Sequence, residues 1–125
     1  MLSDHDCDGF VQVLPGIKMK MLVWGLRMLM VEFRLKEGSV LPPHNHPHEQ
    51  TGYCVSGRLR LVTAGEKRDV AAGDAWSIPG GTEHGAEAIV DSAVIEVFSP
   101  VREDYLPDGI ELPEKVADWP ASEEI

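Results

Sequence analysis

Short strand-like segments separated by turn residues run through almost the whole chain, and this feature limits the fold most. The longest segment, residues 26–36, alternates apolar residues such as Val31 and Phe33 with polar ones such as Glu32 and Arg34. A period of two indicates a strand with one buried face. Turn residues recur roughly every eight to twelve positions, which is typical of a β-sandwich or β-barrel. We therefore predict an all-β fold with strands at residues 10–14, 18–24, 26–36, 51–55, 58–63, 67–70, 75–78 and 92–99.

The length and charge of the chain fit one small domain. Its 125 residues correspond to about one domain, and 21 acidic against 11 basic residues give a formal net charge of −10. This charge disfavours nucleic acid and anionic membranes as partners. The excess of acidic over basic residues lies at the two ends of the chain, and residues 9–102 are neutral overall. We expect residues 1–100 to form the barrel with a short acidic leader, and residues 101–125 to form an acidic tail that packs on the barrel or on a partner subunit.

The apolar and cysteine content leads us to expect a cytoplasmic protein. The longest apolar stretch, residues 19–31, contains Lys20 and Arg27 and is shorter than the roughly 20 apolar residues that span a bilayer. No hydrophobic signal segment precedes the first predicted strand. Cys7 and Cys54 are too few for a disulfide scaffold.

Three histidines have a spacing that suits metal ligands. His44 and His46 stand two residues apart, so in an extended segment both side chains point to the same face, and Gln50 has the same parity. His84 follows a glycine-rich turn, from which a returning strand can face the pair. Three imidazoles and one oxygen donor would leave open positions on a divalent cation, as catalytic metals need. The spacing alone does not exclude that these histidines are exposed turn residues rather than metal ligands. The neighbouring prolines indicate a loop or a strand end, where such histidines are common.

Two longer motifs resemble those of the cupin family. Residues 38–57 contain Gly38, His44, His46, Gln50 and Gly57, and residues 73–84 contain Gly73, Pro79, Gly81 and His84, at the family's spacings. The resemblance implies a small Greek-key β-barrel (jelly roll), often dimeric, that holds a divalent metal at its mouth. It implies that His44, His46, Gln50 and His84 bind one transition metal per chain: Fe, Mn, Co, Ni or Zn. The family usually has glutamate at position 50 and asparagine at position 88, where this chain has Gln50 and Ala88.

The glutamine has a physical consequence for such a site. Three neutral imidazoles and a neutral amide leave the double charge of the ion uncompensated, which favours Lewis acidity and an anionic substrate. Glu49 has the opposite parity and is not the expected ligand. His48 has the right parity and is expected to line the rim.

A second resemblance, in residues 49–53 and 97–106, is to the pectin-degradation cupins. Those enzymes open 4,5-unsaturated monouronates into linear keto acids. The resemblance implies that Glu96 moves a proton, that Phe98 lines the sugar site, and that Arg102 binds the substrate carboxylate as a bidentate fork. The family usually has aspartate at position 96, so Glu96 is longer by one methylene.

Other interpretations stay open at this point. Arg102 can simply pair with Glu103 or Asp104, and Phe98 can belong to the core. Glu96 shares a strand face with Phe98, and a carboxylate facing the barrel interior would need a partner. The alternative functions are a dioxygenase or isomerase acting on another small anionic metabolite, and a module that binds a sugar or metal without turnover.

Overall fold

The computed structural model describes residues 1–106, which form ten strands and one short 3₁₀ helix. The strands are β1 (Val11–Leu14), β2 (Ile17–Trp24), β3 (Leu29–Leu35), β4 (Val40–His44), β5 (Glu49–Ser56), β6 (Arg58–Thr63), β7 (Glu66–Ala71), β8 (Ala75–Ile78), β9 (His84–Ala88) and β10 (Ser92–Ser99), and the helix is η1 (Glu103–Tyr105).

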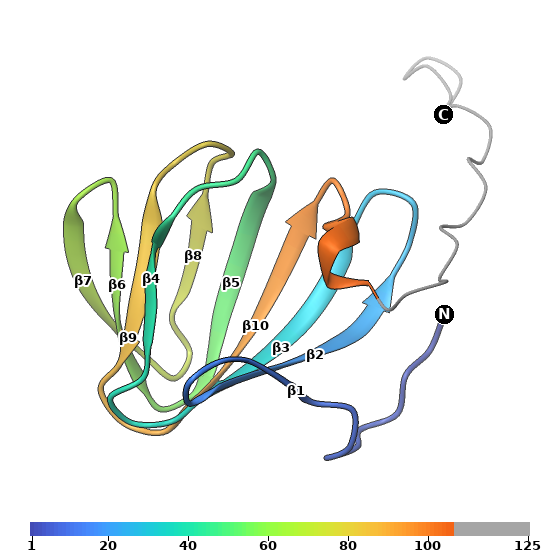
Figure 1. Ribbon diagram of the computed structural model, residues 1–125, viewed down its shortest axis with the longest axis horizontal. Helices are drawn as coiled ribbons and strands as arrows, with labels where there is room; N and C mark the ends of the chain where they lie inside the picture. The colour runs from blue at the N-terminus through green and yellow to red at the C-terminus, as the bar shows by residue number, and fades with distance from the viewer. Residues whose placement is uncertain (107–125) are drawn as a thin grey trace.

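The strands form two antiparallel sheets that face one another (Figure 1). One sheet has the order β1-β2-β3-β10-β5-β8 and the other the order β4-β9-β6-β7. Strands distant in the sequence pair in both sheets, with β10 between β3 and β5 and β9 between β4 and β6. Such crossings are the mark of Greek-key barrels, so the predicted all-β, cupin-type architecture is confirmed.

The alternating pattern of the sequence becomes alternating burial in the strands. Along β5, Gln50, Gly52 and Cys54 are buried while their neighbours are exposed. Buried apolar side chains fill the space between the sheets in two clusters. The first cluster contains Ile17, Leu35, Cys54, Leu59, Ala88 and Val94, and the second contains Met19, Leu29, Val31, Phe98 and Val101.

The sequence prediction differed most from the structure in three strands, and elsewhere strand ends differed by one or two residues at most. The third strand begins at Leu29 rather than at residue 26, because the Gly25 N–H donates to the Met28 carbonyl and closes a turn. Strand β4 was not predicted, since it contains Pro42 and Pro43. It lies at the edge of its sheet, where a residue without an N–H is tolerated. Strand β9 was not predicted because glycine and alanine are poor strand formers.

After β10 the chain crosses back over the barrel. Val101 is 6% exposed and packs in the second cluster together with Tyr105 and Leu106. The predicted packing of the acidic tail falls mostly on residues 107–125, which lie outside the described residues. Within residues 1–106, no helix has the length and hydropathy needed to span a membrane.

Candidate metal centre

Three histidine side chains converge where β4 ends and β9 begins. His44 is the last residue of β4 and pairs across the sheet with His84, the first residue of β9. His46 follows in the connection to β5. The ring centroids lie 4.4 Å apart for His44 and His84, 4.9 Å for His46 and His84, and 5.6 Å for His44 and His46. One ligand atom of each residue lies within 4.8 Å of the others, so the trio is able to hold one metal ion.

Backbone carbonyl groups orient two of these rings. The Nδ1 atom of His44 lies 2.9 Å from the Pro42 carbonyl oxygen, and Nδ1 of His84 lies 2.8 Å from the Thr82 carbonyl oxygen. A carbonyl oxygen only accepts, so each Nδ1 carries the proton and each Nε2 is left with a free lone pair. This is the arrangement that fixes the tautomer of metal-binding histidines.

Gln50 supplies a buried amide oxygen to the same site. Its side chain is 5% exposed, whereas Glu49 is exposed, as the opposite parity of Glu49 predicts. The Oε1 atom of Gln50 and both ring nitrogens of His46 are buried with no hydrogen-bond partner among residues 1–106. Unpartnered buried polar atoms are costly, and a bound cation would satisfy them. The three imidazoles and this amide therefore fit a divalent transition metal.

The protonation of the trio also suits metal binding. Burial, with contributions from the charge of Arg102 and from His84, lowers the pKa of His46 from 6.5 to about 4. Burial likewise lowers the pKa of His84. Neutral imidazole is the form that ligates a metal. His48 is partly buried, with its ring centroid 5.4 Å from that of His46, and lies outside the trio.

Glu96 is a buried carboxyl group beside Gln50. It is 9% exposed and lies on β10, where it faces the barrel interior. Its Oε2 accepts a hydrogen bond from Gln50 Nε2 at 3.0 Å, and its Oε1 accepts one from Trp76 Nε1 at 3.3 Å. Burial raises the pKa of Glu96 to about 8, although both hydrogen bonds oppose that rise. The carboxyl group therefore has the polar partners that its burial requires.

Phe98 and Arg102 also lie near the histidine trio. Phe98 is 2% exposed and belongs to the second core cluster, and its ring centroid lies 5.9 Å from that of His46. The Arg102 guanidinium lies 5.3 Å from the centre of the Phe98 ring. Arg102 also donates to Asp104 at 2.8 Å and to the Tyr105 hydroxyl at 2.8 Å. The pairing of Arg102 with Asp104, left open by the sequence, is thus present.

Most of these groups, though not His46, line a cavity of about 210 Å³ inside the barrel. Its polar lining comes from a few residues, among them His44, Gln50, His84, Glu96 and Arg102. The remaining lining is largely apolar, with Leu41, Leu59, Leu61 and Phe33 among its members. The cavity is thus lined both by polar side chains, which include His44, Gln50 and His84, and by apolar ones.

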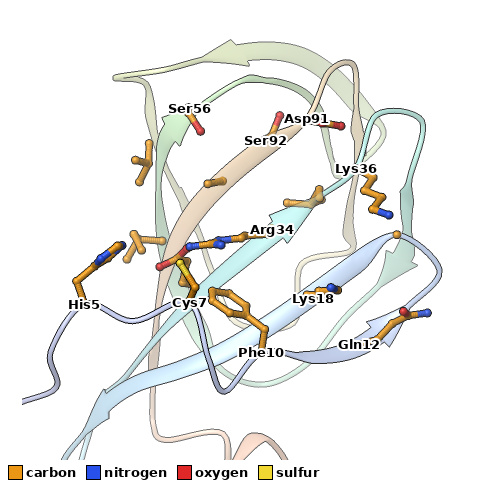
Figure 2. A pocket seen from close by; sticks show the side chains of 16 residues that line it. His5, Cys7, Phe10, Gln12, Lys18, Arg34, Lys36, Ser56, Asp91 and Ser92 are labelled. Carbon is orange, nitrogen blue, oxygen red and sulfur yellow. The ribbon is translucent and has the colours of Figure 1, made fainter.

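A second hollow lies away from this site, on the outer face of the six-stranded sheet beneath the N-terminal segment (Figure 2). There the Arg34 guanidinium stacks 4.3 Å from the centre of the Phe10 ring and pairs with Glu32 at 2.8 Å. Among residues 1–106, the His, Cys, Asp and Glu side chains that line this hollow form no group of three whose ligand atoms converge as those of the histidine trio do.

Sequence reasoning missed two residues of the cavity, Trp76 and Tyr105. Trp76 donates a hydrogen bond to Glu96, and the Tyr105 hydroxyl accepts one from Arg102. A signal for the first existed, because Gly52 interrupts a strand pattern, and a glycine there often marks the close approach of another group. Tyr105 lies within residues 97–106, which carry the resemblance to pectin-degradation cupins, but that resemblance assigned it no role.

The barrel and its histidine cluster define a class of protein. The sequence pattern of the Cupin domain matches residues 31–99, so the chain is a cupin, as its motifs indicated. It shares 36% identity over 93 residues with the pectin degradation protein KdgF of Dickeya dadantii (strain 3937), over 73% of this chain and 84% of the relative. The chain belongs to the KdgF family, and the resemblance to pectin-degradation cupins is confirmed.

Two solved structures extend the comparison. KdgF from Halomonas sp. has 40% identity and a TM-score of 0.76, over 82% of this chain and 92% of that one. An RmlC-like cupin from Shewanella frigidimarina NCIMB 400 has 28% identity and a TM-score of 0.80, over 84% of this chain and 95% of that one. The barrel described above is therefore the fold of both solved proteins.

Proposed function

We propose that this chain is a metal-dependent enzyme of pectin breakdown that opens 4,5-unsaturated monouronates into linear keto-uronates. One observation carries the proposal: four uncharged donors, His44, His46, Gln50 and His84, gather beside a buried carboxyl group and an arginine. Membership of the KdgF family supports the choice of substrate class. A bound divalent ion would act as a Lewis acid that polarises a substrate oxygen and offsets the substrate's negative charge.

The substrate carboxylate is assigned to Arg102. Its guanidinium lines the cavity and its side chain is 12% exposed, so a carboxylate bound there is largely shielded from water. A guanidinium matches a carboxylate with two parallel hydrogen bonds. The Phe98 ring, between Arg102 and His46, offers an apolar surface against the sugar ring.

The proton transfer is assigned to Glu96. Of the described residues that line the cavity, Glu96 alone carries a carboxyl group. In the proposed reaction the Glu96 carboxyl group gives its proton to C4 of the double bond, and water adds at C5 and returns a proton to the Glu96 carboxylate, which gives a cyclic hemiketal. The ring carbon–oxygen bond at C5 then breaks and leaves a ketone, and the hydrated aldehyde at C1 returns the water. A positioned general acid of this kind contributes about 10²–10⁴-fold in rate.

The direct test is turnover of an unsaturated monouronate by the purified protein. The enol chromophore absorbs in the near ultraviolet, so its loss follows the ring opening in real time. We expect the absorbance to fall with metal-loaded protein and to stay constant after treatment with a chelator. Constant absorbance with fully metal-loaded protein, over a range of galacturonate- and guluronate-derived substrates, would exclude this function.

The apolar part of the cavity lining favours one second candidate, an isomerase or dioxygenase acting on a less polar carboxylate. Leu41, Leu59 and Leu61 offer no hydrogen bonds to sugar hydroxyl groups. Oxygen consumption with such a carboxylate would identify a dioxygenase, because uronate opening uses no oxygen. Binding of a uronate in calorimetry without any change in the enol absorbance would instead indicate a binding module.

The homodimer and the cytoplasmic location remain predictions. Light scattering coupled to size-exclusion chromatography measures the first, with about twice the 13.7 kDa chain mass expected. Cell fractionation measures the second.

A further inference from the structure

Three residues form a row across three neighbouring strands. Glu96 of β10 pairs with Gly52 of β5, and Gly52 pairs with Trp76 of β8. Paired residues on adjacent strands project to the same face of a sheet, and the middle residue of this row has no side chain. The Trp76 indole therefore reaches across β5 and donates its Nε1–H to Glu96 Oε1 at 3.3 Å.

Gly52 is required by this crossing rather than by the backbone. Its backbone does not adopt the left-handed conformation that favours glycine. A Cβ atom at this position would lie 2.2 Å from both Cε2 and Nε1 of Trp76, which is far inside van der Waals contact. The indole thus occupies the space that a side chain at position 52 would fill.

The row ends at the metal site through Gln50. Glu96 uses one oxygen to accept from Trp76 and the other to accept from Gln50 Nε2 at 3.0 Å. In this bond the Gln50 amide turns its NH₂ group toward Glu96 Oε2, which accepts. Its Oε1, which is buried and without a hydrogen-bond partner among the described residues, is left for the cation.

We infer that Trp76 is a positioning residue that fixes, through Glu96, the orientation of the Gln50 amide and so the oxygen donor of the metal site. The inference rests on the metal site of the proposed function and not on the uronate reaction. An outer hydrogen bond of this type sets which atom of a ligand faces the metal. Without the indole N–H, the Glu96 carboxylate is free to rotate, and the Gln50 amide loses its fixed acceptor.

A purely structural role for Trp76 makes a different prediction. The indole packs against the first core cluster, so its loss can lower stability whatever it does for the metal. Lower stability alone leaves the ligand set of the bound metal unchanged. Coordination therefore distinguishes the two roles, and Co²⁺ reports it through its visible absorption bands.

The experiment compares Co²⁺ binding to the full-length wild-type chain, Trp76→Phe and Trp24→Phe. Trp76→Phe keeps an aromatic ring and removes the N–H, while Trp24→Phe removes an indole at the end of β2. We expect Trp76→Phe to shift the Co²⁺ bands and to weaken binding about 3- to 10-fold, below the roughly 10–100-fold seen for groups bonded directly to a ligand. Trp24→Phe should match the wild type in both. Wild-type bands and affinity in folded Trp76→Phe would overturn the inference.

If Trp76→Phe does not fold, two further measurements still test the inference. Gly52→Ala displaces the indole from the opposite side and should give the same Co²⁺ changes. In ¹⁵N-labelled wild-type protein, the Trp76 indole N–H signal should move on addition of Zn²⁺ while the Trp24 signal stays in place. A Trp76 indole N–H signal that does not move on addition of Zn²⁺ would overturn the inference. If the variants change Co²⁺ binding as expected but the wild-type protein does not convert a uronate, the inference about Trp76 is supported and only the proposed reaction is excluded.

Discussion

Gln50 donates its amide N–H to Glu96 over 3.0 Å, and this bond joins a candidate metal ligand to the only carboxyl group among the described residues of the cavity. Gln50 lies on β5 and Glu96 on the neighbouring strand β10. Gln50 pairs with Phe98, and Glu96 precedes Phe98 by two residues on β10, so the two side chains are diagonal neighbours. A substitution at Glu96 therefore has two separable consequences, one for the proton and one for the amide.

Glu96→Gln should separate these consequences. A glutamine keeps one oxygen that can accept from Gln50 but can no longer accept from Trp76 as well, so metal affinity should fall no further than the about 3- to 10-fold expected for Trp76→Phe, and the metal-loaded variant should keep near wild-type metal content. It cannot exchange a proton as a carboxyl group does, so kcat on an unsaturated monouronate should fall about 10²–10⁴-fold. Elemental analysis and the enol absorbance measure the two effects. Full activity of metal-loaded Glu96→Gln would contradict the assigned role, and Glu96→Ala, which also loses the acceptor, should lower metal content as well.

Glu96 should also make the metal-free protein less stable as the pH rises from 6.5 to 8. Burial raises its pKa from 4.5 to about 8 in the folded chain. Between these values the folded state binds more protons than the unfolded state, so the free energy of unfolding falls with rising pH, by at most about 1.4 kcal/mol per unit. Urea denaturation with a chelator present measures this slope.

The control for that slope is Glu96→Gln, whose free energy of unfolding should not change between pH 6.5 and 8. His46 acts in the opposite direction and at lower pH. Burial lowers its pKa from 6.5 to about 4, so its contribution is complete above pH 6.5 and is lost as the pH falls toward 4. Equal slopes for wild type and Glu96→Gln between pH 6.5 and 8 would show that the Glu96 pKa is not raised.

Eight of the ten strands and the histidine trio could be predicted from local sequence for physical reasons. Alternating burial marks the long strands such as β10, and two histidines two residues apart in extended chain must share a face. Strand β4 could not be predicted, because its prolines are tolerated only at an edge, and edge position depends on the whole sheet.

The contacts between strands also lay beyond local reasoning. Trp76 meets Glu96 because β5 lies between β8 and β10 with a glycine in register, and register is set by the complete topology. Likewise, both predicted partners of Arg102 were adjacent acids, and only the turn at η1 brings Asp104 rather than Glu103 to the guanidinium.

His44→Ala should abolish stable metal binding. The variant removes one of four donors, and since loss of a group bonded to a ligand already costs about 10–100-fold in affinity, loss of the ligand itself should exceed about 100-fold. Elemental analysis after dialysis measures it. His5→Ala, in the exposed leader, is the matched control and should bind as the wild type does. Equal metal content in both variants would exclude His44 as a ligand.

Asp104→Asn should improve substrate binding. In the structure, Asp104 holds the Arg102 guanidinium at 2.8 Å, so it competes with an incoming substrate carboxylate for the same donors. The Asp104 side chain is 58% exposed, and an ion pair of this kind contributes only about 0.2–1 kcal/mol. Its removal should therefore lower KM by up to about 5-fold and leave kcat and metal content unchanged. Glu103→Gln is the matched control, since Glu103 is an adjacent exposed acid of the same turn and forms no ion pair within residues 1–106. A KM that rises in Asp104→Asn would mean that Asp104 orients Arg102 for the substrate instead of competing with it.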